Sequence, residues 1–143
     1  NIKLRTSRKL LFVAGLLMVF SCYKNESLQR DGDTPDDYLL RLQKHLLGFV
    51  HSNPLNILVW TLRELGLDDS CKSFLDDYEQ FLLQINDPAV RDHLGKLSEN
   101  VVYEDETFLK CREISHRLQS TLKKVCFETE SPLREFTYEY GVF

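Results

Sequence analysis

The segment DDSCKSFLDDYEQFLLQIN at residues 68–86 decides the fold class. Its apolar positions recur every three or four residues and share one face of a helix, whereas a half-buried strand would need strict alternation. Asp68 or Asp69 is the expected N-cap of this helix. The apolar positions are Cys71, Phe74, Leu75, Tyr78, Phe81, Leu82 and Ile85. The pattern predicts an amphipathic helix of about five turns.

The same periodicity continues on both sides of this segment, over residues 35–50, 55–65, 88–101 and 105–126. Thr34 is the expected cap of the earliest of these helices, because a hydroxyl followed by Pro and two acidic residues is typical of a helix start. The side chains which that helix is expected to bury are Tyr38, Leu39, Leu42, Leu46 and Phe49. The predicted fold is therefore all-α, a compact bundle of four to five helices with short connections.

The end of the chain, residues 131–143, shows a different pattern. Phe136, Tyr138, Tyr140 and Val142 alternate with polar residues or Gly, which is a weak strand signal. We expect a short, irregular, non-helical tail.

The N-terminal residues have the features of a secretory signal peptide. Four basic residues within residues 1–9 precede an apolar run at 10–20, and Ser21 supplies a small residue before the break. Eleven residues rise only about 16 Å as a helix, too little for a hydrocarbon core of roughly 30 Å. Residues 1–21 are therefore predicted to be a cleaved signal, followed by a single secreted, extracellular domain at 22–143 with no membrane insertion of its own.

The charge balance argues against nucleic-acid and anionic-lipid partners. The chain carries 18 Lys and Arg against 22 Asp and Glu, and removal of residues 1–21 leaves 14 against 22. A domain this acidic repels phosphate groups.

Four cysteines remain after cleavage: Cys22, Cys71, Cys111 and Cys126. An even number suits two extracellular disulfides, whereas acylation of Cys22 as a bacterial lipoprotein would leave three. On one continuous helix Cys111 and Cys126 are about 22 Å apart, beyond the roughly 7 Å that a bridge allows. Two connectivities remain: 22–111 with 71–126, or 22–126 with 71–111.

The sequence contains no phosphate loop, nucleophile elbow, zinc-protease motif or Cys-x-x-Cys pair. The four histidines His45, His51, His93 and His116 lack metal-ligand spacing. We therefore expect neither an enzyme nor a bound metal or cofactor.

Residues 87–100 (DPAVRDHLGKLSEN), followed by Cys111, resemble the helix-D region of the interleukin-10 cytokine family. Residues 35–43 (PDDYLLRLQ) are similar to helix A of its cytomegalovirus-encoded members, and the spacing between Cys22 and Cys71 is close to that of the family. The resemblance implies a cytokine-like bundle that binds class II cytokine receptor chains on cell surfaces and modulates immune signalling, either a viral or a truncated or diverged homologue. It also implies the pairing 22–111 with 71–126.

The chain departs from the family pattern in three respects. Cys111 and Cys126 are well separated, Gln43 and Gly48 stand where arginines would be expected, and few residues follow Cys126. The family continues with two helices that are exchanged between subunits, and because few residues follow Cys126 we do not expect its intertwined homodimer for this chain.

The predicted function is that of a secreted receptor ligand. Its predicted receptor-binding residues are Arg41, Lys44 and His45, on the exposed face of the 35–50 helix, and Asn25 begins an N-glycosylation sequon. The alternative is a secreted carrier of lipid or another apolar ligand, in which the Phe- and Leu-rich helix faces line a cavity.

Overall fold

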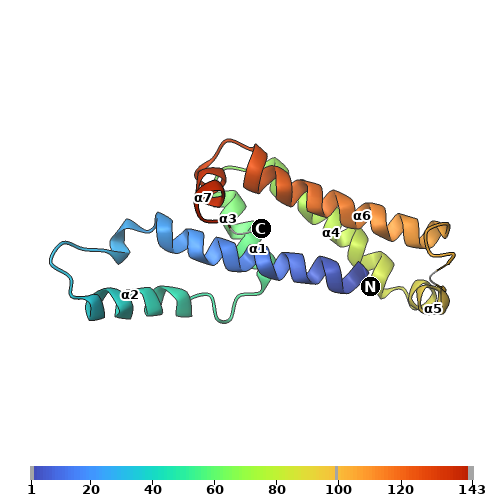
Figure 1. Cartoon of the computed structure of the whole chain (residues 1–143), viewed down its shortest axis with the longest axis horizontal. Coiled ribbons are helices and arrows are strands. Elements are labelled where there is room, and N and C mark those ends of the chain that lie inside the picture. The colour runs from blue at the N-terminus through green and yellow to red at the C-terminus, as the bar shows by residue number, and fades with distance from the viewer. Residues whose placement is uncertain (1, 99, 142–143) are drawn as a thin grey trace.

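The computed structural model describes residues 2–98 and 100–141, and every regular element in these ranges is helical (Figure 1). The elements are α1 (Ile2–Lys24), the short 3-10 helix η1 (Glu26–Leu28), α2 (Pro35–Leu47), α3 (Pro54–Glu64), α4 (Asp68–Asn86), α5 (Pro88–Lys96), α6 (Glu106–Lys123), the π-helical turn η2 (Lys124–Glu128) and α7 (Pro132–Tyr140). The predicted all-α class is confirmed. The predicted number of helices is too low, because the described part contains seven α-helices.

Four of these helices begin with proline in the first turn, after a residue whose side chain accepts a backbone hydrogen bond. Thr34, Asn53, Asp87 and Ser131 are these capping residues for α2, α3, α5 and α7. Proline costs no helical hydrogen bond at this position, because a backbone N–H in the first turn has no acceptor within the helix. The helix start predicted at Thr34 is therefore confirmed.

The predicted cap of α4 is wrong by one position. Leu67 precedes the helix and makes no side-chain cap, so Asp68 and Asp69 lie inside the first turn. Their charges are still favourable there, since the N-terminal end of a helix carries partial positive charge.

The antiparallel pair α4 and α6 forms one side of the core. The predicted stripe of α4 is buried at Cys71, Phe74, Phe81 and Ile85, and α6 opposes it with residues such as Leu118. The residues at the edges of the stripe, Leu75 and Leu82, are partly exposed. The helical periodicity thus correctly located the face that packs.

The predicted signal segment forms most of α1, which lies between α2 and α6 (Figure 1) and packs one of its sides into the core. Its buried side chains are Leu10, Val13, Ala14, Leu17 and Phe20, packed against α3 and α6. Burial of the four larger side chains contributes on the order of 6–12 kcal/mol, similar to the whole stability of an ordinary domain, about 5–15 kcal/mol. The span Arg5–Lys24 is long and apolar enough to cross a membrane, a property that signal sequences and core helices share. Secretion therefore stays a prediction.

The expectation that α2 buries its apolar face is wrong. None of its residues is buried, and Leu39 is 56% exposed. Figure 1 shows the reason: α2 lies on the opposite side of α1 from α4 and α6. Because α1 occupies the position next to the core, α2 contacts little else.

The C-terminal tail is also different from the prediction. α7 is a helix that buries Leu133, Phe136 and Thr137, and Ser131 caps it. The rings of Phe136 and Phe20 lie 5.4 Å apart. The alternation of aromatic residues was misleading, because the buried residues of this segment follow helical spacing. Val142, at the end of the alternation, lies outside the described residues.

The helix predicted over residues 88–101 is shorter, since α5 ends at Lys96. Leu97 takes an extended conformation and Val101 is 47% exposed. α5 buries no side chain, so nothing in the core holds the following residues in a helix; Glu99 lies outside the described residues.

Candidate functional site

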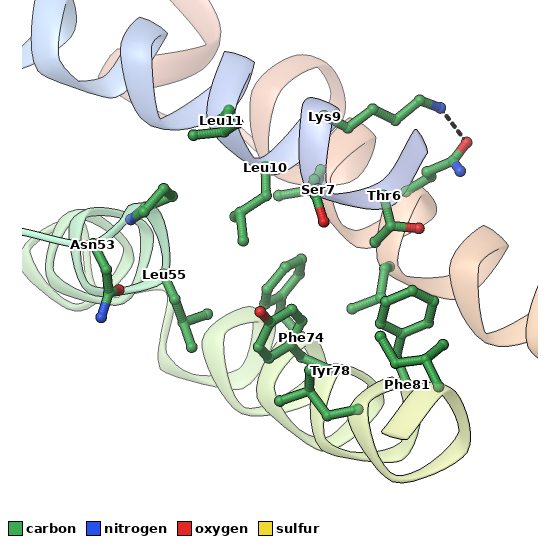
Figure 2. Close-up of a pocket in the computed structure, with 16 residues that line it drawn as sticks. Thr6, Ser7, Lys9, Leu10, Leu11, Asn53, Leu55, Phe74, Tyr78 and Phe81 are labelled. Carbon is green, nitrogen blue, oxygen red and sulfur yellow. Dashed lines mark hydrogen bonds between the residues drawn. The ribbon is translucent and has the colours of Figure 1, made fainter. Parts of the chain in front are cut away.

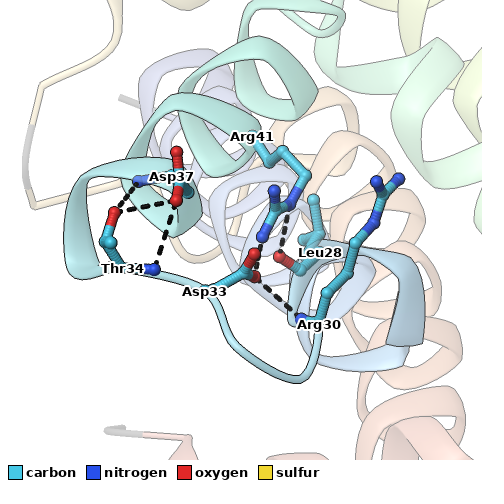
Figure 3. A network of polar contacts seen from close by, with 6 residues as sticks. All are labelled: Leu28, Arg30, Asp33, Thr34, Asp37 and Arg41. Atoms are coloured by element: carbon cyan, nitrogen blue, oxygen red, sulfur yellow. Dashed lines mark hydrogen bonds and ion pairs between the residues drawn. The ribbon is translucent and has the colours of Figure 1, made fainter.

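The predicted receptor-binding residues lie on α2, but only Lys44 is fully exposed. Arg41 points back toward the preceding loop, where its Nε donates a hydrogen bond to the carbonyl oxygen of Leu28 (3.0 Å) and its guanidinium pairs with the carboxylate of Asp33 (Figure 3). The side chain of Arg41 is therefore committed to holding α2 against the 28–33 segment.

His45 faces the end of α1. Its Nε2 lies 2.9 Å from Ser21 Oγ, its Nδ1 lies 3.4 Å from Asn25 Nδ2, and Ser21 Oγ donates to the carbonyl oxygen of Met18. Because an amide nitrogen can only donate, Nδ1 accepts and Nε2 carries the proton; this tautomer is assigned from the network. The two ring nitrogens of His45 thus join α2 to the end of α1 and to the residue that follows it.

The loop before α2 is closed by a second set of polar contacts (Figure 3). Asp33 accepts from the backbone N–H of Arg30 (2.8 Å), and Asp37 accepts from both the N–H and the hydroxyl of Thr34. The reciprocal bond from the Asp37 N–H to Thr34 Oγ1 completes a capping box. These bonds set the start of α2 without any contact with the core.

Asn25, the predicted glycosylation site, is half-buried at the start of η1. Its Oδ1 accepts hydrogen bonds from the N–H and the hydroxyl of Ser27, and its amide nitrogen approaches His45. A glycan on that nitrogen would displace the contact with His45, and glycosylation stays a prediction.

All four cysteines are free thiols in this structure. The contacts of Arg117 on α6 with Asp77 and Gln80 on α4 fix the register of the two antiparallel helices. Counted from these contacts, Cys71 and Cys126 lie at the same level of the bundle to within about one helical turn. The two cysteines of one predicted bridge thus lie at a similar height on neighbouring helices, and the bridge itself stays a prediction.

The other predicted bridge is not brought together. Contacts of Thr6 with Ser115 and of Lys9 with Gln119 show that α1 and α6 run parallel. Along these helices Cys22 and Cys111 are therefore about 30 Å apart. The pairing 22–111 does not fit while α1 occupies the core, and for the processed chain it stays a prediction.

A pocket of about 490 Å³ lies between α1, α3, α4 and α6 (Figure 2). Its walls are apolar, with Leu10, Leu55, Phe74 and Phe81 among the side chains that point toward it. Such an apolar space next to a few polar groups is typical of sites for small apolar ligands.

Polar residues from α1 and α6 stand at one side of this pocket. The ammonium of Lys9 donates a hydrogen bond to Gln119 Oε1, and burial, aided by the nearby charge of Arg5, lowers the pKa of Lys9. Thr6 Oγ1 lies 2.9 Å from Ser115 Oγ in a buried contact. The sequence did not indicate the part of this pocket that α1 contributes, because α1 belongs to the predicted signal.

Among the described residues, no three His, Cys, Asp or Glu side chains are grouped as metal ligands. Comparison of the chain with protein-family models, with curated proteins and with solved structures finds no match.

Proposed function

We propose that this chain is a secreted helical ligand of the interleukin-10 type, which binds cell-surface class II cytokine receptor chains after residues 1–21 are removed. The proposal is supported by the leader-like N-terminus, the all-helical fold and the resemblance of two segments to the family.

The observation that carries the proposal is the position of those two segments. They correspond to α2 and α5, and each of these helices buries no side chain in the body of the protein. Helices that contribute nothing to the core while carrying large apolar and charged side chains on the surface are suited to contact a protein partner.

Surface plasmon resonance of the secreted, processed protein against the two interleukin-10 receptor ectodomains tests this function. Lys44 is exposed on α2, and Lys44→Glu is expected to weaken binding about tenfold, or about 1.4 kcal/mol. Lys72→Glu, an exposed charge on α4, is the matched control and should bind as the unchanged protein does. Absence of micromolar binding to either receptor chain would remove the proposal.

A second candidate function, transport of a lipid or another apolar ligand, is favoured by the 490 Å³ pocket. This function requires that α1 be retained, because Lys9, Leu10 and Leu11 form part of the wall. Native mass spectrometry of the unprocessed chain would reveal a co-purified ligand. Leu55→Trp should expel it by filling the pocket, whereas Leu83→Trp, on the exposed side of α4, should not.

A further inference from the structure

The side of α2 that contacts α1 is not the side on which the apolar stripe of α2 is centred. The half-buried side contains Arg41 and His45 next to Leu42, Leu46 and Phe49. The stripe itself continues around the helix to Leu39, which remains largely exposed (56%). The apolar stripe is thus rotated by roughly 60° from the side that makes contact.

Removal of residues 1–21 would leave a groove where α1 now lies. Its walls would come from α3 and α6, which contact α1 and carry core residues such as Leu58 and Leu118, and from Phe136 beside Phe20. A groove of this kind cannot stay open to water at ordinary stability, since the buried part of α1 contributes several large side chains to the core. Some apolar segment must take the place of α1.

We propose that α2 of the same chain takes this place in the processed protein. This inference rests on the proposed function, because it requires cleavage after residue 21. α2 fits in length: it extends from Pro35 to Leu47, and the core-facing part of α1 extends from Leu10 to Phe20. It also fits in pattern, since its apolar residues lie on one face. None of them is buried in this structure, so the movement would not break an existing core contact of α2.

The chain permits this movement. α2 must shift by roughly 12 Å along its axis and by one helix spacing of roughly 8–10 Å toward the core. The connector to α3, residues 48–53, reaches about 20 Å when extended. The start of α3 already lies beside Leu10 and Leu11, where it lines the same pocket. The shift therefore brings the end of α2 to the start of α3 and closes a helical hairpin.

The movement also decides which face of α2 reaches a partner. Cleavage removes Ser21, the partner of His45, and the inward rotation turns Arg41 and His45 away from the core. They would then join Lys44 on one outer face. The receptor-binding surface predicted from the sequence is thus created by processing, and on it Arg41 and Lys44 share one helix face with the capping residue Asp37.

Two neighbouring leucines on α2 provide a matched test. Leu39 and Leu40 are both exposed here (56% and 65%), but only Leu39 belongs to the apolar stripe. In the secreted, processed protein, Leu39→Ala should lower the melting temperature by roughly 10 °C and Leu40→Ala by less than about 2 °C. Equal effects of the two substitutions would overturn the docking of α2.

Photo-crosslinking keeps the test valid if Leu39→Ala fails to fold. A benzoylphenylalanine at position 39 should form an intramolecular crosslink to α4 or α6 that peptide mass spectrometry locates, and the same group at position 40 should not. A crosslink from position 39 into a second copy, or equal crosslinking from both positions, would overturn the proposal.

The two proposals can fail separately. A secreted product whose intact mass still includes residues 1–21 would contradict the processing that both require. A processed protein with the expected crosslink that binds neither receptor chain would overturn the receptor function and leave the docking of α2 in place.

Discussion

Thr6 Oγ1 and Ser115 Oγ lie 2.9 Å apart and are both buried, at the contact between α1 and α6. Two hydroxyl groups that pair inside an apolar interface set the register of the two helices. In any other register both hydroxyl groups would be buried without a hydrogen-bond partner, which is unfavourable. This pair therefore marks the register of α1 in the unprocessed chain.

In the unprocessed chain, Thr6→Val and Ser115→Ala should each lower the free energy of unfolding by about 1 kcal/mol, and the double variant should cost less than the sum. The coupling arises because either single change removes the same hydrogen bond. Urea unfolding of the four proteins measures it. Strict additivity would show that the two hydroxyl groups do not pair.

Substitution of Phe136 tests whether residues 132–140 form a helix. Phe136 is 3% exposed and lies against Phe20, whereas Tyr138 is 69% exposed. Phe136→Ala should therefore cost about 3–5 kcal/mol, and Tyr138→Ala about 1 kcal/mol or less, through its edge contact with Phe127. Similar costs for both changes, as an irregular tail would give, would contradict this helix.

The acid sensitivity of the protein should depend in part on Asp105. The backbone N–H of Phe108 and, next, the side chain of His93 hold the pKa of Asp105 below its ordinary value. A carboxylate whose pKa is lower in the folded state stabilises the fold above the unfolded pKa, and this contribution disappears as the pH falls through the folded pKa.

Asp105→Asn keeps a capping acceptor and removes the charge. This variant should melt at a lower temperature than the unchanged protein at pH 7, and the difference should disappear as the pH falls through the lowered pKa of Asp105. Melting temperatures recorded between pH 2 and pH 7 check the expectation. A difference that stays constant over the whole range would contradict a role for the charge.

The cysteines should differ in reactivity while they are reduced. Burial raises the pKa of Cys126 to about 11, while Cys22 at the end of α1 is only partly buried. In the unprocessed chain at pH 8, iodoacetamide should modify Cys22 first and Cys126 last, because only about one thiol in a thousand is ionised at that pKa. Peptide mass spectrometry at successive times gives the order, and early loss of the Cys126 thiol would contradict its burial.

Non-reducing peptide mapping of the secreted protein should find Cys71 joined to Cys126, since the α4–α6 register places them at one level. The second bridge, Cys22 to Cys111, should be found only where residues 1–21 are absent. A bridge between Cys71 and Cys111 would contradict the antiparallel register of these helices.

The sequence by itself determined the helices whose ends and faces depend on local chemistry. The Thr34-Pro35 start and the Phe74–Phe81 stripe follow from capping, proline geometry and helical periodicity, which need only neighbouring residues. The local pattern also indicated that Cys111 and Cys126 lie along one continuous helical stretch.

Only the tertiary structure decided which apolar faces are buried. α1 is apolar on all sides and α2 carries an apolar stripe, yet Leu17 is buried and Leu39 is exposed, a difference that could not be read from either segment alone. The same applies to Phe136, whose place against Phe20 made a helix of a segment that looks alternating. Periodicity indicates that one face of a helix is apolar, but packing between segments that are distant in the chain determines which apolar face is buried.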